Sequence, residues 1–241
     1  MGYVDIHCHL LWGIDDGCRS PTEALDAARA LVDLGYGDAA PSPHARSDFP
    51  SQDGELCRTR LVELRDLLAR EGVPLRLHPN AENFLDDAFL ARVARGEPRA
   101  IGEGTRYVLV ELPFASAVPS LPDVVFRLKL KGHTPVMAHP ERCAEFERPG
   151  RAAEVVRLGA ALQLDMGALL GRYGREPRKL AERFLADGLY AAAATDLHRP
   201  DGAREWVGDA LAALEKRAGA AEARRLCEEN PRRAVLGEDL A

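Results

Sequence analysis

The chain has 241 residues, 46% of them hydrophobic, which is enough to bury a sizeable core in one large domain or two small ones. The net charge of −6 leaves no basic footprint, which excludes a typical nucleic-acid-binding protein. We expect a cytoplasmic protein without a disulfide framework or membrane insertion, because five cysteines stand at wide spacings without a C-x-x-C pair and no run approaches the ~18 apolar residues of a membrane span.

The first half of the chain alternates strand and helix patterns. A short apolar strand over residues 2–6 ends at His7. Ser20 is placed as the N-cap of a helix that Gly35 ends, and Glu23 is placed to close a capping box. Further strands are predicted over residues 36–41, 73–77 and 107–110, and further helices over residues 55–70 and 84–94.

The same alternation continues to the C-terminus without a repeat or linker. Strands are predicted over residues 134–138, 161–164 and 189–194, and helices over residues 124–131, 152–158, 178–186 and 202–227. Asn230 and Pro231 begin a last short turn of helix. Seven strand-then-helix units imply a parallel sheet, either closed as a barrel or open and doubly wound.

Polar side chains at or just after the strand ends distinguish these two folds. They come from six of the seven units, whereas an open sheet concentrates its ligands at one switch point. We therefore predict one domain over residues 1–241, built as a somewhat irregular seven-stranded α/β barrel. The side chains are His7, His9, His44, Glu82, Glu111, His139, Asp196 and His198.

These residue types are suited to binding metal ions. His7 and His9 stand at i and i+2, so an extended chain presents both rings on one side, and Asp16 follows in a turn. Five histidines and four carboxylates, without thiolate, suit two or three ions of manganese, iron or zinc. Three divalent ions exceed the charge of four carboxylates, which favours an anionic substrate such as a phosphate ester.

Several motifs in order resemble the polymerase-and-histidinol-phosphatase (PHP) family. The match runs from Asp5 to Pro231 and is most similar to the manganese-dependent protein-tyrosine phosphatases encoded with bacterial capsule and exopolysaccharide genes. The motifs are Asp-Ile-His-Cys-His with Asp-Asp-Gly, Pro-His at 43–44, Asn-Ala-Glu at 80–82, Val-Glu-Leu-Pro at 110–113, Ala-His-Pro-Glu-Arg at 138–142, Thr-Asp-Leu-His at 195–198 and Asn-Pro at 230–231.

This resemblance implies a distorted (β/α)7 barrel with a trinuclear metal centre. It makes Glu111 a bridging carboxylate, places Arg142 near the substrate phosphate, and matches Arg204 to a second such arginine after a one-residue shift. The loop over residues 45–48 departs from the family because it lacks a basic pair after the histidine. The implied ligands are His7, His9, Asp16, His44, Glu82, Glu111, His139, Asp196 and His198.

The expected activity is hydrolysis of phosphotyrosine in proteins in one displacement, with manganese as the cofactor. The resemblance implies a bacterial tyrosine autokinase of polysaccharide export as the phosphotyrosine protein and leaves the oligomeric state open. Three alternatives stay open: a PHP phosphatase of a small metabolite such as histidinol phosphate, an amidohydrolase-type deaminase, and an inactive scaffold. The extra carboxylates Asp16 and Glu82 argue against the deaminase.

Some chemically suggestive residues have simpler explanations. Cys227 and Arg233 satisfy the Cys-x5-Arg spacing of thiol-dependent phosphatases, but no glycine and two acids follow the thiol, so a buried helix residue is the better interpretation. His78 and His133 match no motif. The resemblance favours Asp16 over Asp15 as the ligand. Gln163 and Asp165 could orient ligands, Trp12 could stack on a substrate, and each could equally be structural.

Overall fold

The computed structural model describes residues 2–241, in which parallel strands alternate with helices. All seven strand pairings among these residues are parallel. One sheet has the order β1 (Tyr3–Asp5), β2 (Tyr36–Ala39) and β4 (Arg76–Leu77). The other has the order β3 (His44–Ala45), β5 (Glu82–Phe84), β6 (Tyr107–Glu111), β7 (Thr134–Ala138), β8 (Ala161–Asp165) and β9 (Ala192–Ala194).

The two sheets are parts of one distorted barrel. β2 continues into β3 and β4 into β5 after interruptions that contain Pro41 and Pro79, which have no N–H to donate to a neighbouring strand. The Asn80 side-chain amide compensates by donating to the carbonyl oxygen of Ile6 at 2.9 Å. The last strand meets the first through hydrogen bonds from Asp196 N to His7 O and from His9 N to Leu197 O, each 2.8 Å long. Seven strand positions thus form a ring, which agrees with the predicted barrel.

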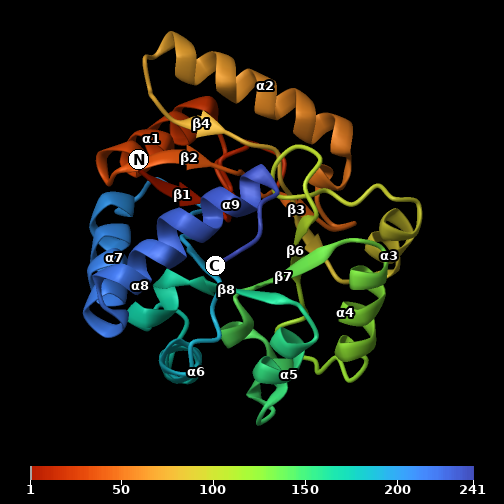
Figure 1. Ribbon diagram of the computed structural model, residues 1–241. Coiled ribbons are helices and arrows are strands. Elements are labelled where there is room, and N and C mark those ends of the chain that lie inside the picture. Colours follow the sequence, from red (N-terminus) through yellow and green to blue (C-terminus); the bar gives the residue numbers. More distant parts are fainter. Residues whose placement is uncertain (1) are drawn as a thin grey trace.

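Helices surround this ring (Figure 1). Helices α1 to α7 follow the strands around the outside, and α9 crosses the amino-terminal end of the barrel beside β1 and β9. The helices are α1 (Pro21–Asp33), α2 (Gly54–Arg70), α3 (Asp87–Ala94), α4 (Leu121–Leu130), α5 (Arg151–Arg157), α6 (Arg175–Ala186), α7 (Ala203–Ala218), α8 (Ala220–Arg224) and α9 (Asn230–Leu236).

Two helix predictions were wrong in part, one at its start and one in its interior. The helix expected over residues 84–94 begins only at Asp87, because residues 82–84 form β5 and the Asp86 side chain caps the helix by accepting from Phe89 N at 2.7 Å. The single helix expected over residues 202–227 is divided at Gly219, whose φ of 84° lies outside the helical region. Both differences arise from local conformations that side-chain periodicity does not encode.

The predicted start of α1 is confirmed in part. Ser20 Oγ accepts a hydrogen bond from Glu23 N at 3.2 Å, as an N-cap does. The Glu23 carboxylate, however, accepts from the backbone N–H of Arg19 at 2.8 Å. The second half of the capping box is therefore replaced by a contact one residue earlier.

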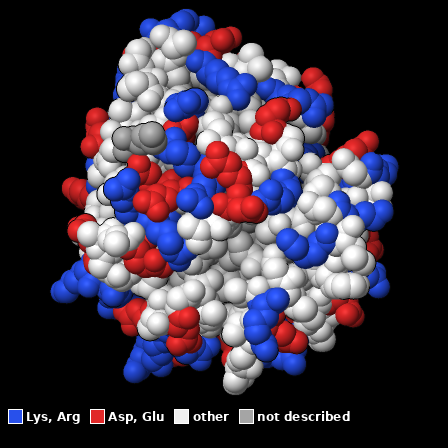
Figure 2. Space-filling model, in the orientation of Figure 1, with Lys and Arg blue, Asp and Glu red and all other residues white. Residues whose placement is uncertain are grey.

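The apolar side chains lie on both sides of the strands. Ile6, Leu109 and Val136 are buried within the barrel, and larger buried clusters pack the helices against its outside. All five cysteines are buried and free. Charged side chains of both signs are interspersed on the face that Figure 2 shows. Within residues 2–241, no helix combines the length and apolar character that crossing a bilayer requires.

Candidate metal centre

The polar side chains predicted at the strand ends converge at the carboxyl end of the barrel. His44 lies in β3, Glu82 opens β5 and Glu111 closes β6, whereas the others follow β1, β7 and β9 within a few residues. Positive φ angles of 31° at His139 and 53° at Asp196 turn the chain where β7 and β9 end. Non-glycine residues adopt this conformation rarely, and it is often found at functional sites.

Four groups of side chains place one ligand atom per residue within 4.8 Å of one another, close enough for each group to hold an ion. Several residues belong to two groups, so the groups form one continuous cluster. They are His9, Asp16, His44 and His198; His7, Glu82 and His139; His7, His9 and Asp196; and His44, Glu82 and Glu111. The structure thus brings together all nine side chains that the sequence predicted as ligands.

Among residues 2–241, several buried atoms of this cluster form no hydrogen bond of regular geometry, although some lie within ion-pair distance of one another, such as His44 Nδ1 and Glu82 Oε2 at 2.8 Å. A buried polar atom left unpaired costs about 1–3 kcal/mol, so several such atoms facing one another need a common partner. Nitrogen and oxygen donors without thiolate suit manganese, iron or zinc, so these residues fit divalent ions. The atoms are His7 Nε2, His9 Nε2, His44 Nδ1, Glu82 Oε2, Glu111 Oε2, His139 Nδ1 and Asp196 Oδ1.

The carboxylates control the protonation of the histidines. Burial disfavours the charged form of His7 and His9, but Glu82 and Asp196 raise the pKa of His7 to about 9, and Asp15 raises that of His9 to about 10. Despite burial, the histidines hold the pKa values of Glu82 and Asp196 well below their usual range. Without metal the protons therefore reside on the rings at neutral pH, and a cation must displace them.

Contacts behind two rings fix which nitrogen faces the cluster. His7 Nδ1 lies 2.8 Å from Gln163 Oε1, and the Gln163 amide nitrogen donates to the Leu164 carbonyl, which leaves Oε1 as the acceptor. His9 Nδ1 lies 2.9 Å from Asp15 Oδ2. Both rings therefore direct Nε2 toward the cluster, as ligand histidines do when a second group holds the other nitrogen.

Asp16, and not Asp15, faces the cluster. Asp16 Oδ1 lies 3.3 Å from His44 Nε2 and 3.4 Å from His198 Nε2. The Asp15 carboxylate instead accepts from the Gly17 backbone N–H at 2.9 Å, in addition to its contact with the ring behind it. A Cβ at Gly17 would collide with the backbone of residue 9, so glycine is required for this turn to pack there. The geometry agrees with the choice of Asp16.

Arg142 lies beside the cluster on a short 3₁₀ turn. Its Nη1 donates to Asp196 Oδ2 at 2.7 Å and to Asp165 Oδ2 at 3.1 Å. The guanidinium carbon lies 4.7 Å from the ring centre of Phe114 and 4.0 Å from that of Tyr173. Burial disfavours the charge, but the two carboxylates outweigh it and raise the pKa of Arg142, so the guanidinium stays cationic. Two aromatic rings thus hold a permanent cation at the edge of the cluster.

Arg46 is a second cation at the cluster, and the sequence reasoning missed it. Its Nη1 lies 4.0 Å from Glu111 Oε2, and its guanidinium carbon lies 4.8 Å from the Phe84 ring centre and 5.9 Å from that of Phe49. Asp48 accepts from its Nε at 3.0 Å. The only signal in the sequence was its position two residues after the predicted ligand His44, just past the end of β3.

Arg204 does not join the cluster. It stands on α7, and its Nε donates to Asp33 Oδ2 at 2.7 Å, where both side chains are exposed. The predicted contact of Arg204 with a substrate phosphate therefore finds no support in the geometry. Arg199 lies nearer, because its Nη2 donates to the backbone oxygen of Asp16 at 3.2 Å.

The other candidates have structural partners. Cys227 is buried, and burial raises the pKa of its thiol, so it presents no thiolate to a substrate. The guanidinium carbon of Arg60 lies 4.7 Å from the ring centre of Trp12. His78 Nε2 lies 2.8 Å from Asp38 Oδ1. These contacts agree with the structural interpretations of Cys227 and His78.

Fold and cluster together define a parallel α/β barrel with a candidate metal centre at the carboxyl ends of its strands. The chain belongs to the CpsB/CapC family of capsular polysaccharide synthesis, whose model matches residues 3–236. It is 30% identical over 217 residues to the tyrosine-protein phosphatase YwqE of Bacillus subtilis, a match that covers 90% of this chain and 85% of YwqE. It is 23% identical over 241 residues to the tyrosine-protein phosphatase CpsB of Streptococcus pneumoniae, covering 98% and 99% of the two chains.

Solved structures give the same relationship. A chain from the crystal structures of YwqE and CpsB, described as unique metal-dependent tyrosine phosphatases, superposes with a TM-score of 0.89 and 28% identity, covering 99% of this chain and 96% of that chain. An organophosphorus hydrolase from Deinococcus radiodurans superposes with a TM-score of 0.59 at 16% identity, covering 97% and 92%. The second match shows a shared fold alone.

Proposed function

We propose that this protein is a metal-dependent phosphatase that hydrolyses phosphotyrosine in proteins. The observation that carries the proposal is the convergence of unpaired, buried histidine and carboxylate atoms beside two arginines. The names of the relatives YwqE and CpsB support the choice of phosphotyrosine over a small metabolite. The nine residues predicted as ligands would hold two or three divalent ions, with manganese proposed and iron or zinc as the other fitting metals.

The bound ions would supply Lewis acidity, which lowers the pKa of a coordinated water towards ~7 and offsets negative charge on the phosphoryl group. Arg142 and Arg46 stand on different sides of the cluster, on the segments after β7 and β3. Their guanidinium groups would bind and orient the phosphoryl oxygens and stabilise the charge that develops on them. Glu111 would help to hold an ion together with His44 and Glu82, and the side chains behind the rings would keep the ligand nitrogens in place.

The leaving group explains a preference for aryl esters. A tyrosine phenol has a pKa of about 10, so its oxygen departs more easily than an alkoxide and needs less help from a general acid. Phe114 is 43% exposed beside Arg142 and His139, where it offers an aromatic surface to an arriving ring. An aromatic substrate is therefore the better fit than an aliphatic ester.

The proposed physiological substrate is the tyrosine-phosphorylated part of a bacterial autokinase that controls polysaccharide export. Membership of a capsular polysaccharide synthesis family supports this assignment. Such a partner would present its phosphotyrosines to the carboxyl end of the barrel, where Arg46 and Arg142 lie.

The decisive experiment measures hydrolysis of a phosphotyrosyl peptide by chelator-stripped protein before and after manganese is restored. A phosphoserine peptide and histidinol phosphate serve as comparison substrates. We expect metal-dependent turnover that favours the tyrosyl peptide, and loss of both turnover and bound manganese in His139→Ala. Turnover of histidinol phosphate alone would show that the protein is a phosphatase of small metabolites. Unchanged activity of His139→Ala would overturn the proposed metal centre.

A further inference from the structure

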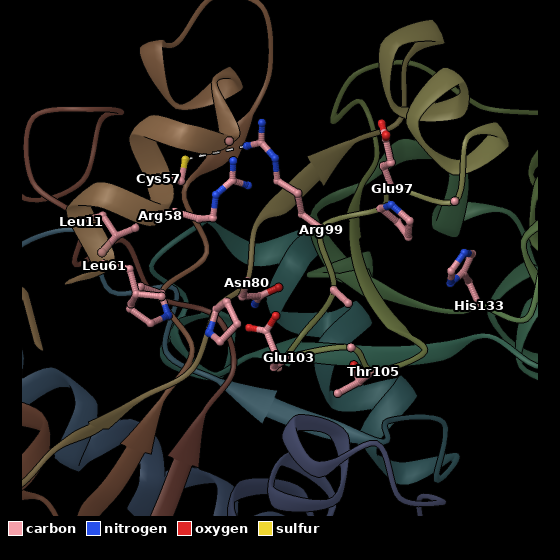
Figure 3. A pocket seen from close by; sticks show the side chains of 18 residues that line it. Leu11, Cys57, Arg58, Leu61, Asn80, Glu97, Arg99, Glu103, Thr105 and His133 are labelled. Carbon is pink, nitrogen blue, oxygen red and sulfur yellow. Dashed lines mark hydrogen bonds between the residues drawn. The ribbon is translucent and has the colours of Figure 1, made fainter.

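A cavity of about 500 Å³ lies apart from the metal cluster, between α2 and the segment before β6 (Figure 3). Its walls come from the amino-terminal half of α2, from Pro41 and Pro79 at the two strand interruptions, and from residues 96–100 and 102–105. None of the nine predicted metal ligands lines it. A cavity of this size accommodates a small-molecule ligand.

One end of this cavity is cationic. Arg99 donates to the carbonyl oxygens of Ser51, at 2.7 Å, and Gln52, and no carboxylate oxygen within residues 2–241 lies within 4.0 Å of its guanidinium nitrogens. Figure 3 shows Arg58 near Arg99 at this end of the cavity. Burial lowers the pKa of Arg99, Cys57 and Asp53 oppose this shift, and the charge of Arg58 adds a smaller lowering contribution. Arg58 itself pairs with the exposed Glu55 at 2.5 Å.

The amino terminus of α2 strengthens this positive field. Gly54, the first residue of α2, lines the cavity, and a Cβ there would lie 3.3 Å from Arg99 Nε. The positive end of the dipole of a 17-residue helix therefore lies beside a guanidinium with no carboxylate oxygen within 4.0 Å among residues 2–241, and the N-cap Asp53 and the first-turn Glu55 offset only part of this field. An anion between Arg99 and Arg58 would relieve this repulsion, and phosphate suits both guanidinium groups and a helix amino terminus.

The rest of the cavity offers hydrogen-bonding groups and an apolar surface. Glu103 and Thr105 stand at the end away from the arginines (Figure 3). His133 Nδ1 is buried at the lining without a hydrogen-bond partner among residues 2–241. Leu11 and Leu61 form an apolar wall. A ligand that matches these surfaces carries a phosphate, hydroxyl groups and a flat apolar part.

We propose that this cavity binds a nucleoside phosphate. The phosphate lies between Arg58 and Arg99 and the base lies against Leu11 and Leu61. The sugar hydroxyls face Glu103. This site is separate from the centre that binds the phosphoryl group of the substrate.

The cavity is connected to the metal cluster by a short chain of contacts. Arg99 holds the carbonyl oxygen of Ser51, and the Ser51 hydroxyl donates to the backbone oxygen of His44 at 2.6 Å. Ser51 is fully buried, so this chain has little freedom to absorb a displacement. A ligand that draws Arg99 toward its phosphate therefore moves the segment that carries His44. Binding of the nucleoside phosphate does not depend on the proposed phosphatase activity. Any change in turnover caused by this movement of His44 does rest on the proposed function.

Binding is tested by calorimetry with UDP-glucose, whose phosphates are internal and offer no monoester to the metal centre. Metal-stripped protein is used so that UDP-glucose cannot compete for manganese. We expect saturable binding to the wild type and to Arg204→Ala, the matched surface control. Binding should weaken by about tenfold or more in Arg58→Glu and in Arg99→Gln, because each removes a charge-assisted contact.

Arg58 is exposed, so Arg58→Glu should leave the unfolding temperature unchanged, even where Arg99→Gln destabilises the fold. Absence of binding at millimolar UDP-glucose, or equal binding by a folded Arg58→Glu, overturns the site. The connection is measured by hydrogen exchange over residues 44–52, where bound UDP-glucose should change protection. No change in protection there overturns the connection. Because neither measurement requires turnover, an inactive enzyme would count against the proposed function and not against this site.

Discussion

The Asp5 carboxylate accepts hydrogen bonds from the hydroxyl of Thr195 at 2.5 Å and from its backbone N–H at 3.3 Å. It also accepts from the His7 backbone N–H at 3.1 Å. Asp5 and Thr195 are fully buried, and each precedes a residue of the candidate metal centre by one or two positions. This pair joins the first and last strands at the point where the barrel closes, so it holds His7 and Asp196 in fixed relation.

Replacing Thr195 by Val removes the hydroxyl and leaves a buried Asp5 oxygen with one partner fewer. We expect the free energy of unfolding to fall by about 1–3 kcal/mol and manganese affinity to fall with it. Urea unfolding and calorimetric titration of the metal-free protein measure the two effects. Thr105→Val is the matched control, because Thr105 Oγ1 donates only to the Ile101 carbonyl, away from the cluster. Equal losses of manganese affinity in the two variants would contradict a specific role for the Asp5–Thr195 contact at the point where the barrel closes.

We expect Gln163 to act through its contact with His7 and not on the substrate. Gln163→Leu removes the acceptor 2.8 Å from His7 Nδ1, so the ring loses the contact that fixes its tautomer and orientation. Loss of such a group typically lowers metal affinity by about 10–100-fold. Manganese titration measures this, and Gln52→Leu on the short turn before α2 serves as control. Saturating manganese should restore much of the turnover in Gln163→Leu, and a defect that saturation leaves unchanged would point to a role outside metal binding.

The strand periodicity and the order of the motifs were sufficient to predict the barrel and to name the nine side chains that cluster at its carboxyl end. A ligand such as Glu111 stands at a strand end that apolar runs define, and the parallel strands then bring distant residues to one face. Arg46 could not be found in this way, because its place depends on two aromatic rings from different segments. The structure does not bring Arg204 to the cluster for a related reason: this exposed arginine pairs with Asp33, which the packing of α7 against α1 places beside it.

Metal binding should release protons. The pKa of His7 is raised to about 9 and that of His9 to about 10, so at pH 7 the metal-free rings are protonated, and ligation requires their neutral form. The apparent manganese affinity should therefore rise as the pH increases from 6 to about 9. Titrations at pH 7 in buffers of different ionisation enthalpy measure the number of protons released. A heat of binding that is the same in every buffer would show that the rings are already neutral.

Arg46 and Arg204 give a direct contrast between a guanidinium at the cluster and one remote from it. Arg46→Ala should lower kcat/KM for a phosphotyrosyl peptide by about 10–1,000-fold, as losing one preorganised donor to a phosphoryl group does. Arg204→Ala should change kcat/KM less than twofold, since Arg204 pairs with the exposed Asp33. Manganese content of both variants should match the wild type. Equal effects of the two substitutions would restore the assignment that the sequence resemblance suggested.

Glu141 should make stability fall as the pH rises. Burial, and then the charge of Asp165, raise the pKa of Glu141 from its ordinary value of 4.5 to about 8. Between these values the folded protein holds a proton that the unfolded chain has released, so the free energy of unfolding decreases with increasing pH across this window. Its two oxygens accept from Asp165 N and from the Tyr190 hydroxyl, each at 2.8 Å. A glutamine at position 141 keeps the shape of the protonated acid.

Glu141→Gln should therefore remove part of the pH dependence, up to about 1.4 kcal/mol per pH unit. Urea unfolding of the metal-free protein at pH 5, 6, 7 and 8 measures the slope for wild type and variant. Other buried groups, such as Asp5, contribute to both curves and cancel in the difference. Glu147→Gln is the control, because that side chain is exposed and its removal should leave the slope unchanged. A wild-type slope in Glu141→Gln would mean that Glu141 is ionised in the folded protein, with its two hydrogen bonds offsetting the cost of burial.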